Sequence, residues 1–159
     1  RQMNFEIRPF HGDALTGKDI DQMVALFRRL DNDEVADYAK LGCSMTEVDD
    51  LYLSDKIESD AGFIAACDGK IVGMASNVEA DDYENVMFLS HLVVDEHYRG
   101  RGIGRALIER AVKNNDARGK MTMLNVSVRN EAALNLYKSL GFAVHSQTMV
   151  SPQRKEAGK

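Results

Sequence analysis

The feature that most constrains this chain is a glycine-rich turn between an apolar strand and an amphipathic helix, within residues 88–114. Apolar and β-branched residues run from Phe88 to Val94 and predict a buried strand. After a short polar turn comes the sequence RGRGIGR, residues 99–105. Beyond it, apolar residues recur at the spacing of one helix face, namely Ile103, Leu107, Ile108, Ala111 and Val112. The glycine-rich turn therefore joins a strand to the first turn of a helix.

Such a turn favours the binding of an anion. The first N–H groups of a helix lack partners within the helix, and the helix dipole adds partial positive charge there. Glycines let a ligand approach the backbone closely, and Arg99, Arg101 and Arg105 add positive charge. These features predict a site for a pyrophosphate. A tight turn with solvated arginines is the simpler interpretation of this segment alone.

The two common nucleotide fingerprints do not fit. The dinucleotide pattern G-x-G-x-x-G/A ends at Arg105 when it starts at Gly100, and at Leu107 when it starts at Gly102. The phosphate loop that ends in G-K-[ST] is absent from the sequence. An NAD-dependent dehydrogenase is therefore disfavoured.

Two segments resemble the GNAT superfamily of N-acetyltransferases. Arg99-x-x-Gly102-x-Gly104 after a hydrophobic strand is similar to that family's acyl-CoA pyrophosphate loop. Residues 130–142, NEAALNLYKSLGF, fill every named position of a pattern that resembles the family's N-x-x-A-x-x-L-Y-x-x-x-G-F signature. The resemblance covers residues 86–142, and the N-terminal half is similar only in its order of elements.

The hydrophobic periodicity predicts the elements β-α-α-β-β-β-α-β-α-β along the chain. Asp68-Gly69 between two β-rich runs predicts a hairpin. Ser44 and Glu47 have the spacing of a capping box. The expected ranges outside the glycine-rich stretch are strands 4–9, 62–67, 70–78, 121–128 and 142–150 and helices 17–30, 34–57 and 131–140. The helix 34–57 is expected either as one piece or as two.

The resemblance implies an α/β fold, with a GNAT-like mixed and mostly antiparallel twisted sheet flanked by helices in a single domain over residues 1–159. We expect residues 152–159 to be a frayed tail. Few residues follow Gly141, so the last strand is expected to be short, missing or supplied by a partner. An uncovered strand edge invites pairing, and we therefore expect a homodimer.

The resemblance also implies acetyl-CoA as cosubstrate and a set of residues that bind it. Leu92, Val93 and Val94 resemble the strand segment whose backbone pairs with the pantetheine arm. Asn130 resembles the residue that caps the next helix and contacts the cofactor, although it also fits an ordinary helix cap. Tyr137 is expected to protonate the departing thiolate, with packing on a helix face as the alternative. The pyrophosphate loop would comprise Arg99, Gly100, Arg101, Gly102, Ile103, Gly104 and Arg105.

A general base is less well indicated. In many relatives a glutamate lies on the central strand where this chain has Ser90, followed by His91. An unperturbed histidine pKa of about 6.5 suits a base. However, strand alternation places His91 on the face opposite Ser90 unless a bulge intervenes. Glu84, with Glu79 and Asp82, could act through water, although each also fits a solvated acidic loop.

The composition restricts the remaining classes. A net charge of −5 argues against a general nucleic-acid binder. No apolar run is long enough to span a membrane, and no signal peptide is indicated at residues 1–10. Cys43 and Cys67 suggest neither a disulfide framework nor a metal site, so we expect a cytoplasmic protein. Acidic residues at 31–37 and 79–84 could steer a cationic acceptor, or be solvated.

The sequence therefore predicts an enzyme that transfers an acetyl group from acetyl-CoA to a primary amine by direct attack. The acceptor, a small molecule or a peptide, is not identified by the sequence. The alternative is a non-catalytic CoA-binding or regulatory module on the same fold, which the missing strand carboxylate favours and Tyr137 disfavours.

Overall fold

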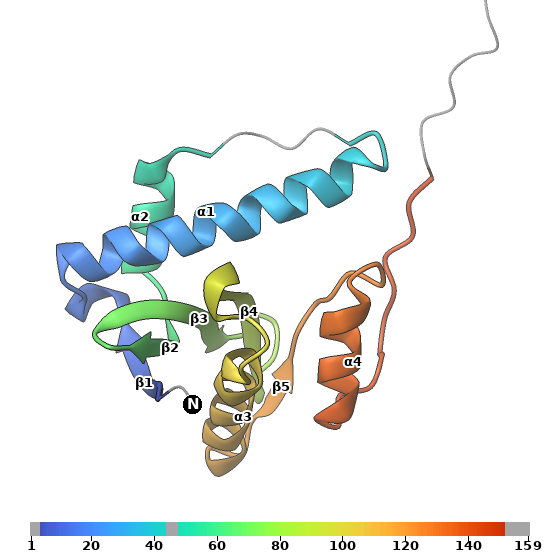
Figure 1. Cartoon of the computed structure of the whole chain (residues 1–159). Coiled ribbons are helices and arrows are strands. Elements are labelled where there is room, and N and C mark those ends of the chain that lie inside the picture. Colours follow the sequence, from blue (N-terminus) through green and yellow to red (C-terminus); the bar gives the residue numbers. More distant parts are fainter. Residues whose placement is uncertain (1–3, 44–47, 152–159) are drawn as a thin grey trace, which may run out of the picture.

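One five-stranded sheet organises the fold, with strands in the order β1-β2-β3-β4-β5 (Figure 1). The computed structural model describes residues 4–43 and 48–151, except for the side chains of residues 31–35. Neighbouring strands are antiparallel except β4 and β5, which are parallel. The predicted mixed, mostly antiparallel sheet is thus confirmed. The strands are β1 (Glu6–His11), β2 (Ala61–Cys67), β3 (Lys70–Glu79), β4 (Val86–Val94) and β5 (Met121–Met123), and the α-helices are α1 (Gly17–Ala39), α2 (Asp50–Glu58), α3 (Ile103–Ala117) and α4 (Glu131–Ser139).

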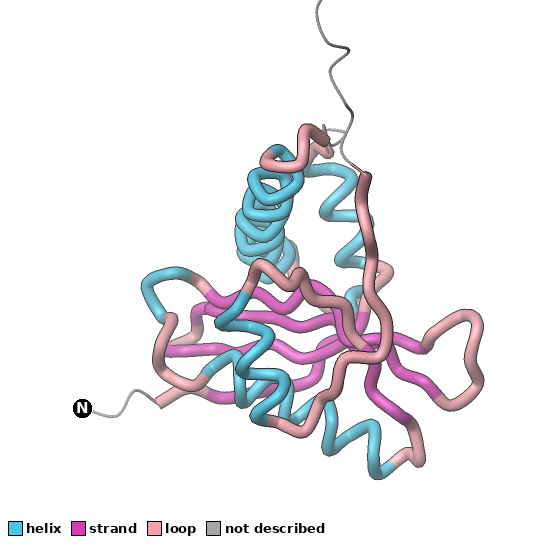
Figure 2. The backbone as a smooth tube through the Cα atoms, turned by 90° about the vertical axis from the view of Figure 1, so that its right-hand side faces the viewer, coloured by secondary structure: helices cyan, strands magenta, loops and turns pink. Residues whose placement is uncertain are grey.

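Helices cover both faces of the sheet (Figure 2). On one face, Met23 and Phe27 of α1 and Ile57 of α2 pack in a cluster with sheet residues such as Ile64 and Met74. On the other face, α3 packs in a second cluster with inward-facing sheet residues, which include Phe63, Ala65, Val72, Ala75 and Leu89. Successive strand residues alternate between the two clusters, as the pleat requires. The central strands are therefore buried on both faces.

The Asp68-Gly69 hairpin was predicted correctly. Both residues have positive φ, 50° at Asp68 and 78° at Gly69. Positive φ at both central residues is the requirement of a two-residue turn that matches the twist of paired strands. The turn joins β2 to β3, the central hairpin of the sheet.

The first helix is longer than predicted. Thr16 and Asp19 form a capping box at its start, and the helix then continues through residues 31–34, where we expected a break. Asp and Asn lower helix propensity only modestly, whereas Gly or Pro would be needed to end the helix there. A glycine with positive φ, Gly42, occurs only after the helix has ended. The helix is therefore long enough to extend along the whole width of the sheet (Figure 1).

The second helix is shorter than predicted. It begins at Asp50, and the side chain of Asp49 accepts a hydrogen bond from the Tyr52 N–H. The proposed capping box of Ser44 and Glu47 lies outside the described residues, as does the tail 152–159.

Three strand boundaries also differ from the prediction. β1 continues through Pro9 to His11 because it is an edge strand, where a missing N–H can face away from the ladder. β5 ends at Met123 instead of residue 128. In the described residues after Gly141, up to residue 151, there is no strand. Residues 142–150 therefore do not form the last strand, and of the alternatives left open by the sequence, a short strand in these residues is excluded.

A buried amide pair determines where β5 joins the sheet. Asn77 of β3 and Asn115 of α3 exchange two side-chain hydrogen bonds of 2.9 and 3.0 Å. The Asn115 side chain also donates to Thr122 Oγ1 of β5 at 2.9 Å. One fully buried side chain therefore ties a strand, a helix and the short edge strand together.

None of the helices in the described part of the chain combines the length and the apolar character that crossing a bilayer requires.

Candidate acyl-CoA and acceptor site

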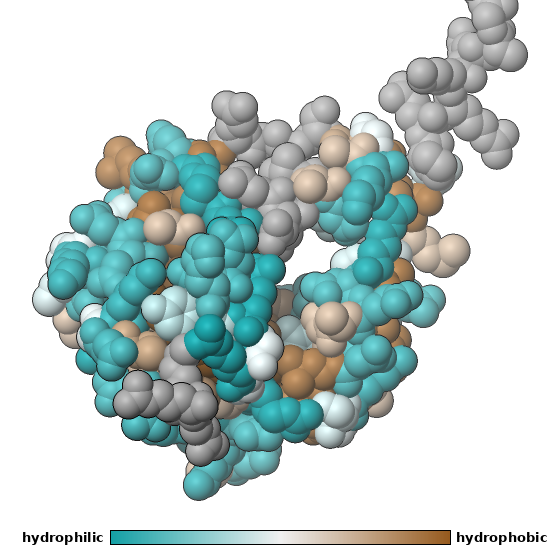
Figure 3. All heavy atoms as spheres, in the orientation of Figure 1, coloured by the Kyte–Doolittle hydropathy of each residue, from teal (hydrophilic) through white to brown (hydrophobic). Residues whose placement is uncertain are grey.

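The strands β4 and β5 separate after a short paired segment. They pair at three positions, from Val86 opposite Met121 to Phe88 opposite Met123. Beyond Phe88, the described part of the chain contains no strand on this side of β4, although β3 still pairs with its other side as far as Val94. The segment 89–94 therefore presents an unpaired strand edge toward the space between β4 and α4. Figure 3 shows an opening through the molecule below α1 and beside α4.

A β-bulge interrupts the pairing of β4 with β3, within the same segment whose other edge is unpaired. Met74 of β3 is opposite Val93, whereas Ser76 is opposite Ser90, so β4 has one more residue than β3 between these pairs. His91 is at the bulge and has a φ of 49°, which is uncommon for a residue with a side chain. The bulge turns the His91 ring to the face of α1, where its centroid lies 4.5 Å from that of Phe27. Strand alternation alone would place His91 on the face opposite Ser90. The structure instead contains the bulge that the sequence left open as the alternative.

The glycine-rich turn follows directly after the unpaired edge. Gly100 and Gly102 have φ of 74° and 83°, and a Cβ added at either glycine would meet no atom within 4 Å beyond the neighbouring residues of the chain. Gly102 caps α3 without a side-chain acceptor, and the first turn of α3 contains no acidic residue. The N-terminus of α3 thus offers backbone N–H groups and positive dipole in an open position.

The three arginines of the turn differ in their contacts. Arg99 Nε donates to the Val94 carbonyl at 3.1 Å, which holds the turn against the end of β4. The Arg101 guanidinium lies 5.6 Å from the Tyr98 ring. Arg105 pairs with Glu109 at 3.4 Å and donates to Ser139 Oγ at 2.8 Å. Arg105 therefore connects the start of α3 to the end of α4, in addition to any role toward an anion.

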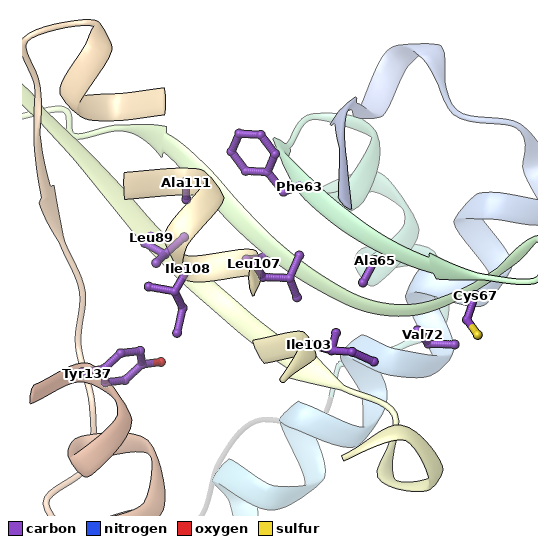
Figure 4. Close-up of a cluster of buried hydrophobic side chains, with 11 residues drawn as sticks. Phe63, Ala65, Cys67, Val72, Leu89, Ile103, Leu107, Ile108, Ala111 and Tyr137 are labelled. Carbon is purple, nitrogen blue, oxygen red and sulfur yellow. The ribbon is translucent and has the colours of Figure 1, made fainter. Parts of the chain in front are cut away.

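The second motif forms α4, which borders the open space opposite β4. The Asn130 side chain accepts a hydrogen bond from the Ala133 N–H and so caps the helix. Gly141, with a φ of 91°, follows the end of the helix. Tyr137 packs 5.8 Å from Phe142 between ring centroids, and Figure 4 shows its hydroxyl pointing from α4 toward Ile108 of α3.

The Tyr137 hydroxyl is in a chemically informative position. The residue is 8% exposed, and burial raises the pKa of its phenol above the ordinary value. Within the described part of the chain no partner accepts or donates to this hydroxyl, and no fully buried side-chain oxygen lacks a partner. The hydroxyl must therefore reach accessible space although the ring is buried. A protonated phenol whose hydroxyl is accessible meets the requirements of a proton donor.

His91 is held as a neutral imidazole. Its Nε2 lies 3.3 Å from Lys56 Nζ of α2, and its Nδ1 lies 3.0 Å from Ser90 Oγ. An ammonium group only donates, so Nε2 accepts and Nδ1–H donates to Ser90. Burial, and secondly the charge of Lys56, lower the pKa of His91 to about 4. In this arrangement a lysine occupies the ring nitrogen that would accept a proton from an amine.

The acidic residues proposed for base catalysis or steering lie elsewhere. Glu84 is exposed in the turn before β4, about 20 Å along the strand from His91 at the usual rise per residue. Glu79 is paired with Lys120 at 2.8 Å and with Arg118 at 3.3 Å. Asp37 contacts Ser127 and Arg129. The structure thus brings none of Glu84, Glu79 and Asp37 to the bulge.

The sequence did not identify Lys56 or Phe27 as neighbours of His91, nor the electrostatic interaction between Asp60 and Lys56. Asp60 accepts hydrogen bonds from Ser76 Oγ and the Ala61 N–H, and burial raises the pKa of its carboxyl. These residues come from α1, α2 and the loop before β2, far from either motif. A lysine on the apolar side of a short helix was a weak signal that periodicity alone assigns to solvent.

The open backbone features fit a CoA-type ligand. A pantetheine amide can pair with an unpaired strand edge, and a pyrophosphate can accept from the N–H groups at the start of α3. The open space at Gly100 and Gly102 leaves room for phosphate oxygens beside the backbone. The two features are continuous along the chain, from Leu92 to Arg105.

Comparisons with known proteins agree with this geometry. A family model described as "Acetyltransferase (GNAT) family" matches residues 24–142. The chain is 37% identical over 95 residues to an uncharacterised N-acetyltransferase of Methanocaldococcus jannaschii, covering 55% of this chain and 41% of that protein. It is 32% identical over 106 residues to the N-acetylaspartate synthetase of Danio rerio, covering 64% and 36%. The chain thus spans about two fifths of the length of these curated relatives.

Solved structures show the same fold. An aminoglycoside N-acetyltransferase, AAC(6')-Iy, in complex with CoA superimposes with a TM-score of 0.68. The match covers 99% of this chain and 98% of that chain at 20% identity. At that identity the likeness establishes the arrangement of helices and strands.

Proposed function

The chain belongs to the acetyltransferase (GNAT) family, and we propose that it transfers an acetyl group from acetyl-CoA to a primary amine. One observation carries the proposal: the unpaired edge of β4 leads without interruption into an open, glycine-capped helix N-terminus. A strand edge and a helix N-terminus in this order bind the two chemically different parts of a CoA molecule. The names of the curated relatives, which are N-acetyltransferases or an N-acetylaspartate synthetase, support the same activity.

Each part of the cofactor is proposed to be bound by a different segment of the chain. Backbone groups of Leu92, Val93 and Val94 hold the pantetheine arm, and N–H groups on this edge polarise the thioester carbonyl. The turn from Arg99 to Arg105 holds the pyrophosphate, and Asn130 caps α4 beside the ligand. Acetyl-CoA, when bound, supplies the acetyl group as a thioester.

Proton transfer is assigned to two residues, one on β4 and one on α4, that would act from opposite sides of the space between these elements. We call this space the slot. Tyr137 donates a proton to the departing thiolate sulfur, because its phenol is protonated and its hydroxyl reaches accessible space. His91 Nε2 takes the proton of the amine, once Lys56 has left this nitrogen. Glu84 is not part of this proposal, because it lies at the other end of β4.

A thiol-release assay with a panel of primary amines tests the activity. The wild-type protein should release free CoA only when acetyl-CoA and a suitable amine are both present. CoA at 100 times its dissociation constant should stabilise the fold by about 2.7 kcal/mol, whereas NAD should stabilise it much less. CoA binding without turnover on any amine would instead favour the non-catalytic CoA-binding module. Equal shifts in melting temperature with NAD and CoA would contradict both the acetyltransferase and the CoA-binding module.

We also propose a homodimer that covers the C-terminal edge of the sheet. β5 is the edge strand, and Met121, Val128, Val144 and Met149 are exposed apolar residues on or after it. A groove of about 240 Å³ lies between α3 and Leu140, and both apolar and charged side chains line it. Light scattering at micromolar concentration tests this, and a monomer would contradict it.

A cytoplasmic location is proposed on the basis of the two thiols. Cys43 is exposed and Cys67 is buried, and neither forms a disulfide. Fractionation of cells that express the protein would test the assignment.

A further inference from the structure

Lys56 is a cation in an unusual setting. It is half-buried on α2, and its Nζ lies 3.3 Å from His91 Nε2 and 5.3 Å from the centre of the Phe27 ring. Among the described residues, no carboxylate lies within ion-pair distance of its Nζ. An ammonium has three donors, and the imidazole uses one of them. Two donors and the charge are therefore available to a ligand.

Asp60 interacts electrostatically with Lys56 but does not compensate its charge well. Asp60 acts on Lys56 only through space, since its carboxylate is occupied by Ser76 Oγ and the Ala61 N–H. Burial raises the pKa of Asp60, so the neutral form of this carboxyl is favoured relative to an exposed aspartate. The positive charge of Lys56 is thus partly buried without a close counter-ion, which is costly unless an anion binds.

Two arginines of α1 are already paired. Arg28 of α1 pairs with Asp50, and Arg29 pairs with Glu96. Lys56 therefore differs from both arginines in lacking an ion pair among the described residues. It also lies beside the bulge of β4, where an acceptor amine must approach the unpaired edge.

We propose that Lys56 binds a carboxylate of the acceptor, so that the acceptor is a primary amine that carries a carboxylate, such as a free amino acid. This inference rests on the proposed acetyltransferase function and specifies its substrate class.

The contact between Lys56 and His91 also explains how His91 becomes free to accept a proton from the amine. In the structure, Lys56 donates to His91 Nε2 and occupies its lone pair. A carboxylate that takes the ammonium away from the ring frees Nε2 and neutralises the neighbouring charge. Since that charge lowers the pKa of His91, the histidine becomes a stronger base when an acidic acceptor binds. An acceptor without a carboxylate leaves the ring occupied.

Matched acceptor pairs test the proposal. L-alanine is compared with L-alaninamide, and β-alanine with β-alaninamide, by thiol release with acetyl-CoA. The wild type should prefer each acid by at least about tenfold in kcat/KM. The amines of the amide acceptors are less basic, so a larger fraction of them is deprotonated and able to attack at neutral pH. This difference favours the amides and therefore works against the expected preference for the acids. Equal kcat/KM for acid and amide would overturn the proposal.

Substitutions at Lys56 locate the preference. Lys56→Met removes the charge but keeps a long apolar chain, and it should abolish the preference mainly by raising KM for the acids. Lys56→Arg should retain most of it. Lys113→Met removes a lysine on the exposed surface of α3 and serves as the matched control, with no change expected. A Lys56→Met variant that still prefers acids would contradict the assignment. The peptides Ala-Asp-amide and Ala-Asn-amide distinguish a side-chain carboxylate from a free α-carboxylate.

A binding measurement keeps the test independent of turnover. The His91 imidazole is followed by NMR in the CoA-loaded protein during titration with N-acetylalanine or N-acetylalaninamide. The acid should raise the pKa of His91 and the amide should not, and Lys56→Met should remove the difference. If no amine is acetylated, the proposed function fails, and this titration alone decides the carboxylate site. An identical response to acid and amide would refute it.

Discussion

The proposed CoA-binding side and the proposed acceptor-binding side of β4 are built in different ways. On the CoA side, the unpaired strand edge, the glycine-rich turn and the start of α3 are consecutive in the sequence, from Leu92 to Arg105. On the acceptor side, His91 contacts Phe27 and Lys56, which are 64 and 35 residues away along the chain. One side is a local backbone structure, and the other is a set of side chains that only the packing of α1 and α2 brings together.

This difference indicates which features can vary without loss of the fold. In the proposed function, backbone N–H groups bind the parts common to every CoA molecule, so this local motif needs only the correct turn and helix. The proposed acceptor contacts come from side chains of α1 and α2, and substitutions there need not disturb the turn. A single mutation should therefore affect one side of the edge and leave the other intact.

The largest effect is expected at Tyr137, where the two sides meet in the chemical step. Tyr137→Phe removes the hydroxyl and keeps the ring that packs against Phe142. Turnover should fall by roughly 10²–10⁴, the usual scale for loss of a positioned proton donor. CoA affinity and melting temperature should change little. Wild-type turnover with a verified acceptor would show that Tyr137 is a packing residue.

The next largest effect should separate the CoA side from the acceptor side. Gly104→Val should weaken CoA binding about 100-fold, or about 2.7 kcal/mol, by placing branched carbons beside the N–H groups that the pyrophosphate needs. The position has room, since the nearest atom to an added Cβ is Val94 Cγ2 at 3.7 Å. Gly104→Ala is the matched control, and Gly102 is less suitable because its φ of 83° strains any side chain. Calorimetry that finds unchanged affinity for Gly104→Val would show that this segment is only a turn.

A smaller effect is expected at the amide pair that links β3, α3 and β5. Asn115→Ala leaves the buried Asn77 side chain without its partner and should lower the free energy of unfolding by about 2 kcal/mol. Because the same side chain also bonds Thr122 of β5, CoA affinity should fall as well. Denaturant unfolding measures the first effect and calorimetry the second. Loss of stability without loss of CoA affinity would mean that β5 does not set the width of the slot.

The smallest predicted effect concerns pH on the acceptor side. The folded protein favours neutral His91, so its contribution to stability is full above about pH 6.5 and is lost as the pH falls toward about 4. Allowing for partial exposure, the loss should be about 1–2 kcal/mol. Asparagine tolerates the positive φ of this position, so His91→Asn should remove this contribution to the pH dependence of the free energy of unfolding.

Comparison of the two proteins cancels the other titrating groups. Asp60 acts in the opposite direction, because its raised pKa makes stability fall as the pH rises above about 3.8. Thermal unfolding at pH 4, 5, 6 and 7 provides the measurement. Parallel stability curves for wild type and His91→Asn would contradict the assigned environment of His91.

The sequence could predict much of the fold because its strongest signals are local. The Asp68-Gly69 hairpin, the helix after Gly102 and the Asn130 cap follow from residues within one or two turns of each other. Boundaries that depend on distant neighbours were predicted less well. The early end of β5 depends on packing partners that the local sequence does not show, whereas α1 continues past residues 31–34 because Asp and Asn lower helix propensity only modestly.

The sequence by itself determined the glycine-rich turn, the alternation that buries both faces of the sheet, and the tyrosine on α4, because each needs only short-range backbone geometry and periodicity. Only the tertiary structure decided that β4 separates from β5 after Phe88, that a bulge turns His91 toward α1, and that Lys56 occupies its ring nitrogen. The physical reason is that strand pairing and side-chain contacts across elements depend on long-range packing. Residues 35 or more positions apart can meet at hydrogen-bond distance without any pattern in the sequence between them.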